Sequence, residues 1–174
     1  MQMVFQDPFS SLNPKMTVLE TVVDPLLIHD LMSRSMAKEL ARNLLEKVGI
    51  IPVEDFQKRF PHQLSGGQQQ RVAIARVLAL QPKVLICDES VSMLDVEIQS
   101  EILDLLRSLQ QDLGLAIIFV THDLSVASSF CHRIIVLDKG EIVEEGNADE
   151  LIRNPKAALT RQLVDVSPRI SSVI

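Results

Sequence analysis

Residues 64–73 read LSGGQQQRVA, and this stretch decides the fold because it places a serine and two glycines where a helix begins. The first N–H groups of a helix have no partner within the helix, and the helix dipole adds partial positive charge there. Small side chains at Ser65, Gly66 and Gly67 would let a phosphate group reach these N–H groups. The same residues also fit a helix that is merely capped. The stretch therefore predicts a helix start, with an anion site as one of two interpretations.

Two apolar runs that end in polar residues follow this helix start. The first covers residues 84–87 and is followed by Asp88 and Glu89, and the second covers residues 116–120 and is followed by residues 121–123, THD. Short runs of this kind are typical of buried strands in a parallel sheet that is covered on both faces.

Helical patterns surround these strands. Apolar residues recur at helical spacing through residues 36–48 and 98–113, and the glycine after each pattern, Gly49 or Gly114, predicts the end of a helix. Residues 17–20, TVLE, fit a capping box that opens another short helix. The alternation of strand, helix and strand predicts an α/β fold.

A β-hairpin and a helical region are expected near the end of the chain. Residues 134–137 and 141–144 are short apolar-rich runs on either side of residues 138–140, DKG, which are typical of a turn. A helical region is expected to begin near Asp149.

Three motifs in this order resemble the C-terminal part of an ABC-type ATPase. Residues 64–68 read LSGGQ, which is the family signature, residues 88–95 read DESVSMLD where the family usually has DEPTSALD, and residues 119–124 read FVTHDL. Residues 1–18, MQMVFQDPFSSLNPKMTV, carry Gln6 at the position of the Q-loop glutamine and are similar to the oligopeptide, dipeptide and nickel importer branch. The resemblance covers nearly the whole chain.

This resemblance implies an α/β fold with a truncated P-loop NTPase core, a mostly parallel sheet and an added helical subdomain. Residues 1–174 would form one partial ABC ATPase domain. Within it, the resemblance implies a Q-loop region at 1–16, a helical subdomain with the signature at 17–80, and the C-terminal part of the core lobe with the tail at 81–174.

The resemblance also implies a site for ATP and Mg²⁺. Asp88 would hold Mg²⁺ through water, Glu89 would polarise the attacking water as general base, and His122 would donate to a γ-phosphate oxygen. Gln6 would reach Mg²⁺ or the attacking water and couple the site to a transmembrane partner. The alternatives are a solvated acidic turn for the two carboxylates, a helix-capping histidine, and an ordinary loop amide.

The signature would serve the nucleotide of another subunit. Ser65 and Gly67 would bind the γ-phosphate of ATP held by a second ABC ATPase subunit, with Gly66 and Gln68 in the same cofactor-binding segment, and Asp95 would organise the shared interface. The two subunits would sandwich the nucleotide head to tail, so that ATP favours the closed dimer.

A P-loop is not found in the sequence. Such a loop needs two glycines five apart, followed at once by Lys and Ser or Thr, and no glycine of this chain meets that spacing. In the family the P-loop precedes the Q-loop, so it would lie upstream of Met1. If a P-loop makes some three charge-assisted hydrogen bonds to ATP, a chain without it would lose about 5 to 9 kcal/mol of the ATP-binding free energy. We therefore expect this chain by itself to bind ATP poorly and to hydrolyse it negligibly.

The composition argues against several other functions. A chain of 174 residues with 47% hydrophobic content suffices for one ordinary domain, and neither a transmembrane helix nor a secretory signal is predicted. The net charge of −6 and the isoelectric point near 5.2 disfavour nucleic acid as a partner. Cys87 and Cys131 lack the spacing of metal ligands.

Three functional hypotheses follow. The first is the C-terminal portion of the ATP-binding subunit of an ABC importer for peptides or related small solutes, held at the cytoplasmic face of the inner membrane by two transmembrane permease subunits and served indirectly by a solute-binding protein. The second is a noncatalytic truncated module that completes a partner subunit's ATP site. The third, a DNA-repair ATPase of the same superfamily, is disfavoured by the short helical insert and the acidic charge.

Overall fold

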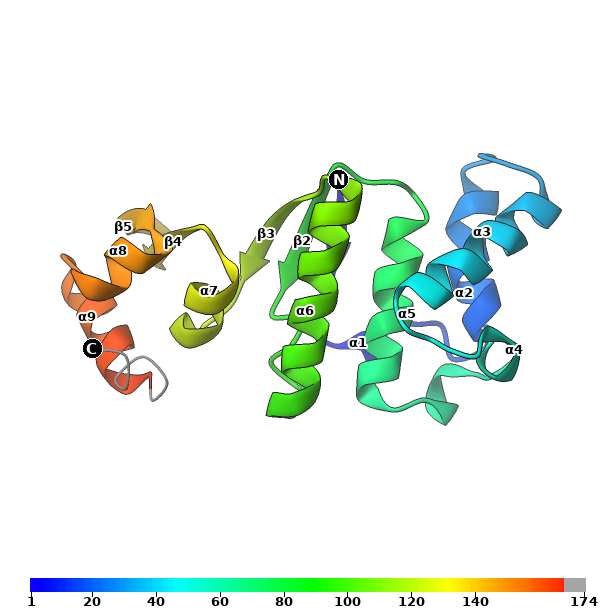
Figure 1. Cartoon of the computed structure of the whole chain (residues 1–174), viewed down its shortest axis with the longest axis horizontal. Coiled ribbons are helices and arrows are strands. Elements are labelled where there is room, and N and C mark those ends of the chain that lie inside the picture. Colours follow the sequence, from blue (N-terminus) through cyan, green and yellow to red (C-terminus); the bar gives the residue numbers. More distant parts are fainter. Residues whose placement is uncertain (168–174) are drawn as a thin grey trace. The chain divides into compact units, whose positions relative to one another are not determined.

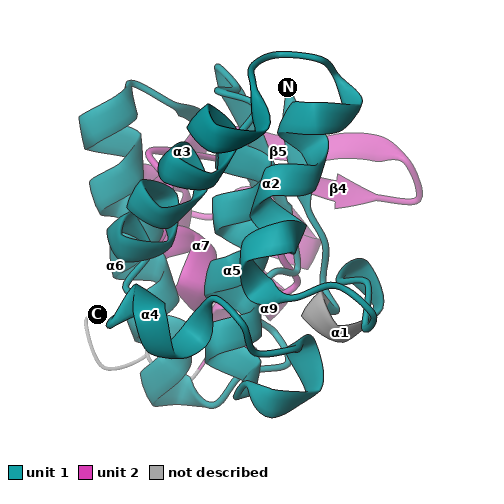
Figure 2. Cartoon of the chain, turned by 90° about the vertical axis from the view of Figure 1, so that its right-hand side faces the viewer, with its two compact units in different colours: residues 1–120 teal, residues 121–174 magenta. Residues whose placement is uncertain are grey.

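The computed structural model describes residues 1–167, apart from the side chains of Pro8 and Phe9. The chain divides into two compact units, unit 1 (Met1–Val120) and unit 2 (Thr121–Ile174), which Figure 2 colours separately. The predicted boundaries near residues 16 and 80 stay a prediction. The end of the predicted tail, 168–174, lies outside the described residues.

A three-stranded parallel sheet forms the centre of unit 1. Its strands, in the spatial order β1-β2-β3, are β1 (Gln2–Val4), β2 (Val84–Asp88) and β3 (Ala116–Val120). In the register of the central pair, Cys87 lies opposite Phe119. Both strands that follow the predicted helix start are confirmed, and so is their parallel pairing.

Helices α5 (Gly66–Leu78) and α6 (Val96–Leu113) contact one another and begin near the end of the sheet where strands β2 and β3 finish (Figure 1). The connections from β1 to β2 and from β2 to β3 are both crossovers between parallel strands, and both step in the same direction across the sheet. When two such crossovers have the same handedness, their helices lie on the same face of the sheet. Accordingly Cys87 is fully buried, whereas Ile118 and Val120 on the other face are 51% and 46% exposed. Within unit 1, the sheet is therefore covered on one face only, where two covered faces were expected.

A helical region separates β1 from β2. It contains α1 (Pro8–Ser11), α2 (Val18–Ile28), α3 (Arg34–Lys47), α4 (Val53–Phe56) and the short 3-10 helix η1 (Pro61–Gln63). Helices α2, α3 and α5 pack against one another. The largest side chains that this packing removes from solvent are Leu26, Leu45 and Ile74.

Local caps fix the ends of these helices. The Glu20 N–H donates to Thr17 Oγ1 at 3.3 Å and the Thr17 N–H donates to Glu20 Oε2 at 2.8 Å, which confirms the predicted capping box. Gly49 follows α3 and Gly114 ends α6 with φ of +79° and +62°, a left-handed backbone that glycine adopts without steric cost. Both predicted helix ends are confirmed.

Unit 2 is built around an antiparallel hairpin. Its elements are α7 (Leu124–Phe130), β4 (Arg133–Asp138), β5 (Glu141–Asn147), α8 (Ala148–Arg153) and α9 (Ala158–Val166). The predicted hairpin and the helical region near its end are confirmed, whereas the sequence patterns did not predict α7. The buried core of this unit consists of Leu124, Ala127, Ile134, Val136, Ala148, Leu151 and Val164.

Within residues 1–167, no helix combines the length and the apolar character needed to cross a bilayer.

Candidate functional site

The two predicted carboxylates lie where strand β2 ends. Asp88 is the last residue of β2, pairs with Val120 of β3 and is half-buried. Glu89 follows with a left-handed φ of +43°, and its N–H donates to the Val120 carbonyl at 2.9 Å. A non-glycine residue in this region costs about 1 kcal/mol or more and is found often at functional sites. The chain turns sharply here, and successive side chains at a strand end leave on different sides.

Ser92 holds the turn after Glu89. Its N–H and its hydroxyl both donate to the Glu89 carbonyl, at 3.0 and 2.9 Å. Ser90, at the position where the family usually has proline, is 2% exposed, and its hydroxyl has no hydrogen-bond partner among the residues that the structure describes. The turn is therefore held by residue 92 and does not need a proline at residue 90.

Gln6 lies beside Glu89. The Gln6 Nε2 donates to Glu89 Oε2 at 2.7 Å. Strand β1 brings the two residues together, because Val4 at its end pairs with Cys87 of β2 and the parallel strands finish at the same edge. The structure thus joins two of the three predicted catalytic residues across 83 positions of sequence.

The oxygen atoms at this edge fit Mg²⁺. Asp88 offers a carboxylate, and Gln6 bonds to Glu89 through Nε2, so the amide Oε1 is not the atom used in that contact. Mg²⁺ prefers oxygen ligands, usually takes one or two carboxylates from a protein, and completes its shell with water and phosphate oxygens. Among residues 1–167, no three His, Cys, Asp or Glu side chains cluster closely enough to hold a metal ion. A Mg²⁺ ion here would need further oxygens from a nucleotide and water.

The signature segment begins helix α5 with a reciprocal cap. The Gln68 N–H donates to Ser65 Oγ at 3.3 Å, and the Ser65 N–H donates to Gln68 Oε1 at 3.0 Å. The interpretation as a capped helix is therefore confirmed for these two side chains. A cap does not exclude an anion, because the N–H groups of Gly66 and Gly67 also lie at the helix terminus, outside the helical ladder.

Both glycines of the signature face the beginning of α6. A Cβ on Gly67 would lie 2.6 Å from Ile98 Cγ2, and a Cβ on Gly66 would lie 3.5 Å from Leu94 Cδ2. Asp95 caps α6, since its Oδ1 accepts from the Ile98 N–H at 3.0 Å. The signature segment and Asp95 therefore lie in one contiguous part of unit 1.

His122 belongs to unit 2, where its side chain is exposed. On either side of it, Thr121 Oγ1 accepts from the Asp123 N–H at 3.0 Å, and Asp123 Oδ1 accepts from the N–H groups of Ser125 and Val126 at 2.8 and 3.4 Å. The residue that caps helix α7 is therefore Asp123 and not the histidine. The role of His122 toward a γ-phosphate stays a prediction.

Arg71, which no sequence motif singled out, links two parts of unit 1. Its Nη1 donates to the Val48 carbonyl at the end of α3 at 2.9 Å, and its Nη2 pairs with Glu101 Oε2 of α6 at 2.8 Å. A Cβ on Gly49 would lie 2.9 Å from Arg71 Nη1, so glycine leaves room for this contact. One feature of the sequence could have pointed to Arg71: it is a cation within the signature helix, four residues after Gly67, and residues four apart share one face of a helix.

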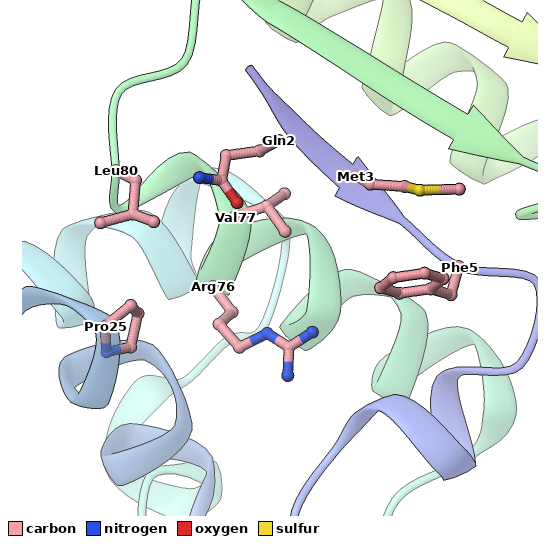
Figure 3. Close-up of a pocket in the computed structure, with 7 residues that line it drawn as sticks. All are labelled: Gln2, Met3, Phe5, Pro25, Arg76, Val77 and Leu80. Atoms are coloured by element: carbon pink, nitrogen blue, oxygen red, sulfur yellow. The ribbon is translucent and has the colours of Figure 1, made fainter. Parts of the chain in front are cut away.

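A pocket of about 270 Å³ opens between strand β1 and helices α2 and α5 (Figure 3). Its walls are apolar except for one amide and one guanidinium group. The lining residues are Gln2, Met3, Phe5, Pro25, Arg76, Val77 and Leu80.

Arg76 is the cation of this pocket. Burial lowers its pKa, which the charge of Asp24 partly opposes. The Arg76 Nη1 donates to the Ser11 carbonyl, and no carboxylate among the described residues forms an ion pair with the guanidinium. The pocket therefore combines apolar walls with a half-buried positive charge.

Comparisons with known proteins agree with these features. The model of the ABC transporter family matches residues 1–92, more than half of the chain. The oligopeptide transport ATP-binding protein OppF of Escherichia coli is 46% identical over 168 residues, which cover 96% of this chain and 50% of that protein. The glutathione import ATP-binding protein GsiA of Pectobacterium atrosepticum is 44% identical over 167 residues, 96% of this chain and 26% of that protein.

Two further comparisons concern a second relative and a solved structure. The probable peptide ABC transporter ATP-binding protein y4tS of Sinorhizobium fredii is 46% identical over 168 residues, 97% of this chain and 47% of that protein. The structure of cbiO1 from Clostridium perfringens, part of the ABC transporter complex cbiONQ, has a TM-score of 0.79 at 32% identity and covers 99% of this chain and 66% of that chain. The chain thus spans half or less of the length of these curated relatives.

Proposed function

We propose, because the chain belongs to the ABC transporter family, that it forms part of the ATP-binding subunit of an importer for peptides or related small solutes. The relatives that support this proposal are named for oligopeptide, peptide and glutathione transport. The single observation that carries the proposed chemistry is the hydrogen bond from Gln6 to Glu89 at the edge of the sheet where Asp88 ends strand β2.

In this proposal Glu89 takes a proton from the water that attacks the γ-phosphate. Gln6 holds one carboxylate oxygen of Glu89, Oε2, and thereby orients the carboxylate toward that water. Asp88, the last residue of β2, is then left for the hydration shell of the metal. Bound Mg²⁺ and ATP would supply the electrophilic phosphoryl group. His122 would donate to a γ-phosphate oxygen, as the family resemblance implies.

The nucleotide site would be shared between two ATPase subunits. Ser65 is exposed at the N-terminus of α5, where the N–H groups of Gly66 and Gly67 and the helix dipole favour a phosphate. Asp95, also exposed, caps the neighbouring helix α6. These two helix starts suit a surface that closes head to tail over ATP held by the second subunit.

Permease subunits would dock beside strand β1 and hold the protein at the cytoplasmic face of the membrane, with a solute-binding protein acting through them. The pocket in Figure 3 supports this docking site, because its walls come from the strand that leads to Gln6 and from α5, the helix that the signature begins. An apolar side chain next to a carboxylate would match its walls and Arg76. A segment bound there would contact both elements at once.

A second candidate is a noncatalytic module that completes the ATP site of a partner subunit. One observation favours it: the signature segment and Asp95 lie together in unit 1, whereas the sequence contains no P-loop. The DNA-repair alternative has no counterpart among the transport proteins named above.

The decisive experiment joins this chain to upstream coding sequence that carries a P-loop, expresses it with its permease subunits in vesicles, and measures ATP hydrolysis together with peptide uptake. Glu89→Gln should lower both rates about 100-fold or more, because a general base contributes roughly 10² to 10⁴. Glu141→Gln, at an exposed carboxylate where strand β5 begins, serves as the control and should leave both rates unchanged. Full activity of Glu89→Gln would refute the catalytic assignment. To test the module, the unextended chain is added to an intact subunit, whose ATPase rate should then change.

A further inference from the structure

We propose that Ile98 is a positioning residue that locks the start of the signature helix to the start of α6, so that Ser65 and Asp95 are presented to the second subunit's nucleotide as one rigid surface. The inference rests on the proposed function for the identity of that second subunit. The lock itself is a contact within this chain and can be measured separately.

The contact between Gly67 and Ile98 leaves no room for a side chain at residue 67. A Cβ there would lie 2.6 Å from Ile98 Cγ2, a separation that real Cβ atoms essentially never show, and Gly67 is buried. The requirement for glycine at this position is therefore explained by packing inside the chain, without any phosphate. Gly66 differs, because its Cβ would lie in ordinary contact, 3.5 Å from Leu94 Cδ2.

A second contact joins α5 and α6 further along the two helices, on the same faces that carry Gly67 and Ile98. Arg71 lies four residues after Gly67 on α5, and its Nη2 pairs with Glu101 Oε2 at 2.8 Å, three residues after Ile98 on α6. Residues three or four apart share one face of a helix. The two helices are thus held by one apolar contact near their N-termini and one ion pair a turn later.

Ile98 also holds the cap of its own helix. Its N–H donates to Asp95 Oδ1 at 3.0 Å, while its side chain meets Gly67. One residue therefore connects, through its backbone, to the predicted interface residue Asp95 and, through its side chain, to the segment that contains Ser65. A shift of α5 relative to α6 would change the distance between these two presented groups.

The geometry specifies a compensating pair of substitutions. Gly67→Ala adds a methyl group where Ile98 Cγ2 lies, so α5 must move away from α6. Ile98→Ala removes Cγ2 and makes room for that methyl, whereas Ile98→Val retains both γ-carbons and does not. If packing sets the position of the signature helix, Ile98→Ala should rescue Gly67→Ala and Ile98→Val should not.

The test uses the 174-residue chain and an intact, hydrolysis-deficient ATP-binding subunit of the same branch. ATP-dependent association of the two is measured by fluorescence anisotropy, and thermal unfolding of each variant is followed by circular dichroism. Gly67→Ala should weaken association at least tenfold, and the control Gly146→Ala, whose Cβ would meet nothing nearer than Leu151 Cβ at 3.9 Å, should leave it unchanged. The association of the double variant Gly67→Ala with Ile98→Ala should return to within threefold of that of Ile98→Ala alone. The association of the double variant Gly67→Ala with Ile98→Val should stay as weak as that of Gly67→Ala. Ile98→Ala alone should weaken association of the folded chain, though clearly less than Gly67→Ala does, whereas a role in stability alone would leave association unchanged.

Three outcomes would overturn the inference. In the first, Gly67→Ala binds normally. In the second, Ile98→Ala restores the melting temperature of Gly67→Ala but not its association, which would mean that Gly67 admits the phosphate directly. In the third, neither measurement shows coupling between the two positions. If the unsubstituted chain shows no ATP-dependent association, the proposed function fails, and the melting temperatures of the variants at residues 67 and 98 still decide whether Ile98 locks the helices.

Discussion

Arg71 holds the Val48 carbonyl with Nη1 at 2.9 Å and the Glu101 carboxylate with Nη2 at 2.8 Å. Val48 caps α3 and Glu101 lies on α6, so a single guanidinium group joins the helical region between β1 and β2 to a helix that packs on the sheet. The planar fork of arginine can serve two acceptors at fixed angles, which an ammonium group on a flexible stem does less well.

The first prediction concerns this double contact. Arg71→Lys should lower the free energy of unfolding by about 1 to 3 kcal/mol, because a single ammonium group cannot hold both the buried Val48 carbonyl and the Glu101 carboxylate in this geometry. Urea denaturation measures the change. Lys47→Gln, which breaks the exposed pair of Lys47 with Asp112 at 3.2 Å, is the control and should cost about 1 kcal/mol or less. Equal losses for the two variants would contradict the assignment.

The second prediction concerns Gln6. In the extended, transport-competent protein, Gln6→Glu should lower the rate of single-turnover hydrolysis about tenfold or more, because it places a second carboxylate 2.7 Å from Glu89 Oε2 and like charges repel. ATP affinity, measured separately by titration, should change far less. The control Gln111→Glu adds the same charge on an exposed position of α6 and should leave the rate unaltered. A normal rate for Gln6→Glu would show that Gln6 does not orient Glu89.

The third prediction concerns the pocket in Figure 3. Arg76→Met keeps an apolar side chain but removes the charge, so co-purification of the extended protein with its permease subunits should weaken about tenfold if a permease carboxylate binds there. Arg34→Met removes a charge in the first turn of α3, away from the pocket, and should have no effect. Undiminished complex formation by Arg76→Met would exclude Arg76 as a docking residue.

The fourth prediction concerns pH. The pKa of Glu144 lies below its ordinary value of 4.5, because the nearby Thr160 hydroxyl and the N–H groups of Lys156 and Ala157, which donate to its carboxylate at 2.9 Å, stabilise the charged form. A carboxyl group whose pKa is lowered by folding contributes stability that is present above its ordinary pKa and is lost as the pH falls through the lowered one.

The thermal midpoint of the chain should therefore decline below about pH 4.5, and Glu144→Gln should make that decline shallower. Scanning calorimetry at several pH values measures the effect. Glu141→Gln, an exposed carboxylate at the start of the same strand, is the control and should retain the original decline. An unchanged slope for Glu144→Gln would mean that these bonds are not maintained in solution.

The fifth prediction concerns nucleotide. The unextended chain should show no saturable binding of fluorescent ATP at micromolar concentrations, because a P-loop would contribute about 5 to 9 kcal/mol of the binding. Isothermal calorimetry with and without Mg²⁺ provides a label-free check. Micromolar affinity in either measurement would show that the remaining groups suffice.

Features with a local cause could be predicted from the sequence. The apolar runs that became β2 and β3, the capping box at Thr17, and the glycine that ends α6 each depend on residues within a few positions. The motif order also placed Asp88 and Glu89 at a strand end. Helix α7, with only seven residues and Asp123 as its cap, carries too short a pattern to distinguish from a loop.

Features that depend on distant partners could not be predicted in the same way. Arg71 finds Val48 and Glu101 at 23 and 30 positions away, and no periodicity reveals such a pair. The contact of Gly67 with Ile98 depends on how closely α5 approaches α6, which the pattern of either helix leaves open. The patterns of α5 and α6 also do not reveal which face of the sheet the two helices cover.

Strand β3 has a consequence for work with the chain at the bench. It lies at the edge of the three-stranded sheet, its sequence is AIIFV, and Ile118 and Val120 are about half exposed on it. Uncharged apolar edge strands of this kind recruit further strands from other molecules. A purified sample should therefore stay monodisperse longer when it is dilute, cold and in mild detergent. Ile118→Lys, which places a charge on this strand, is the first substitution to try for reducing aggregation.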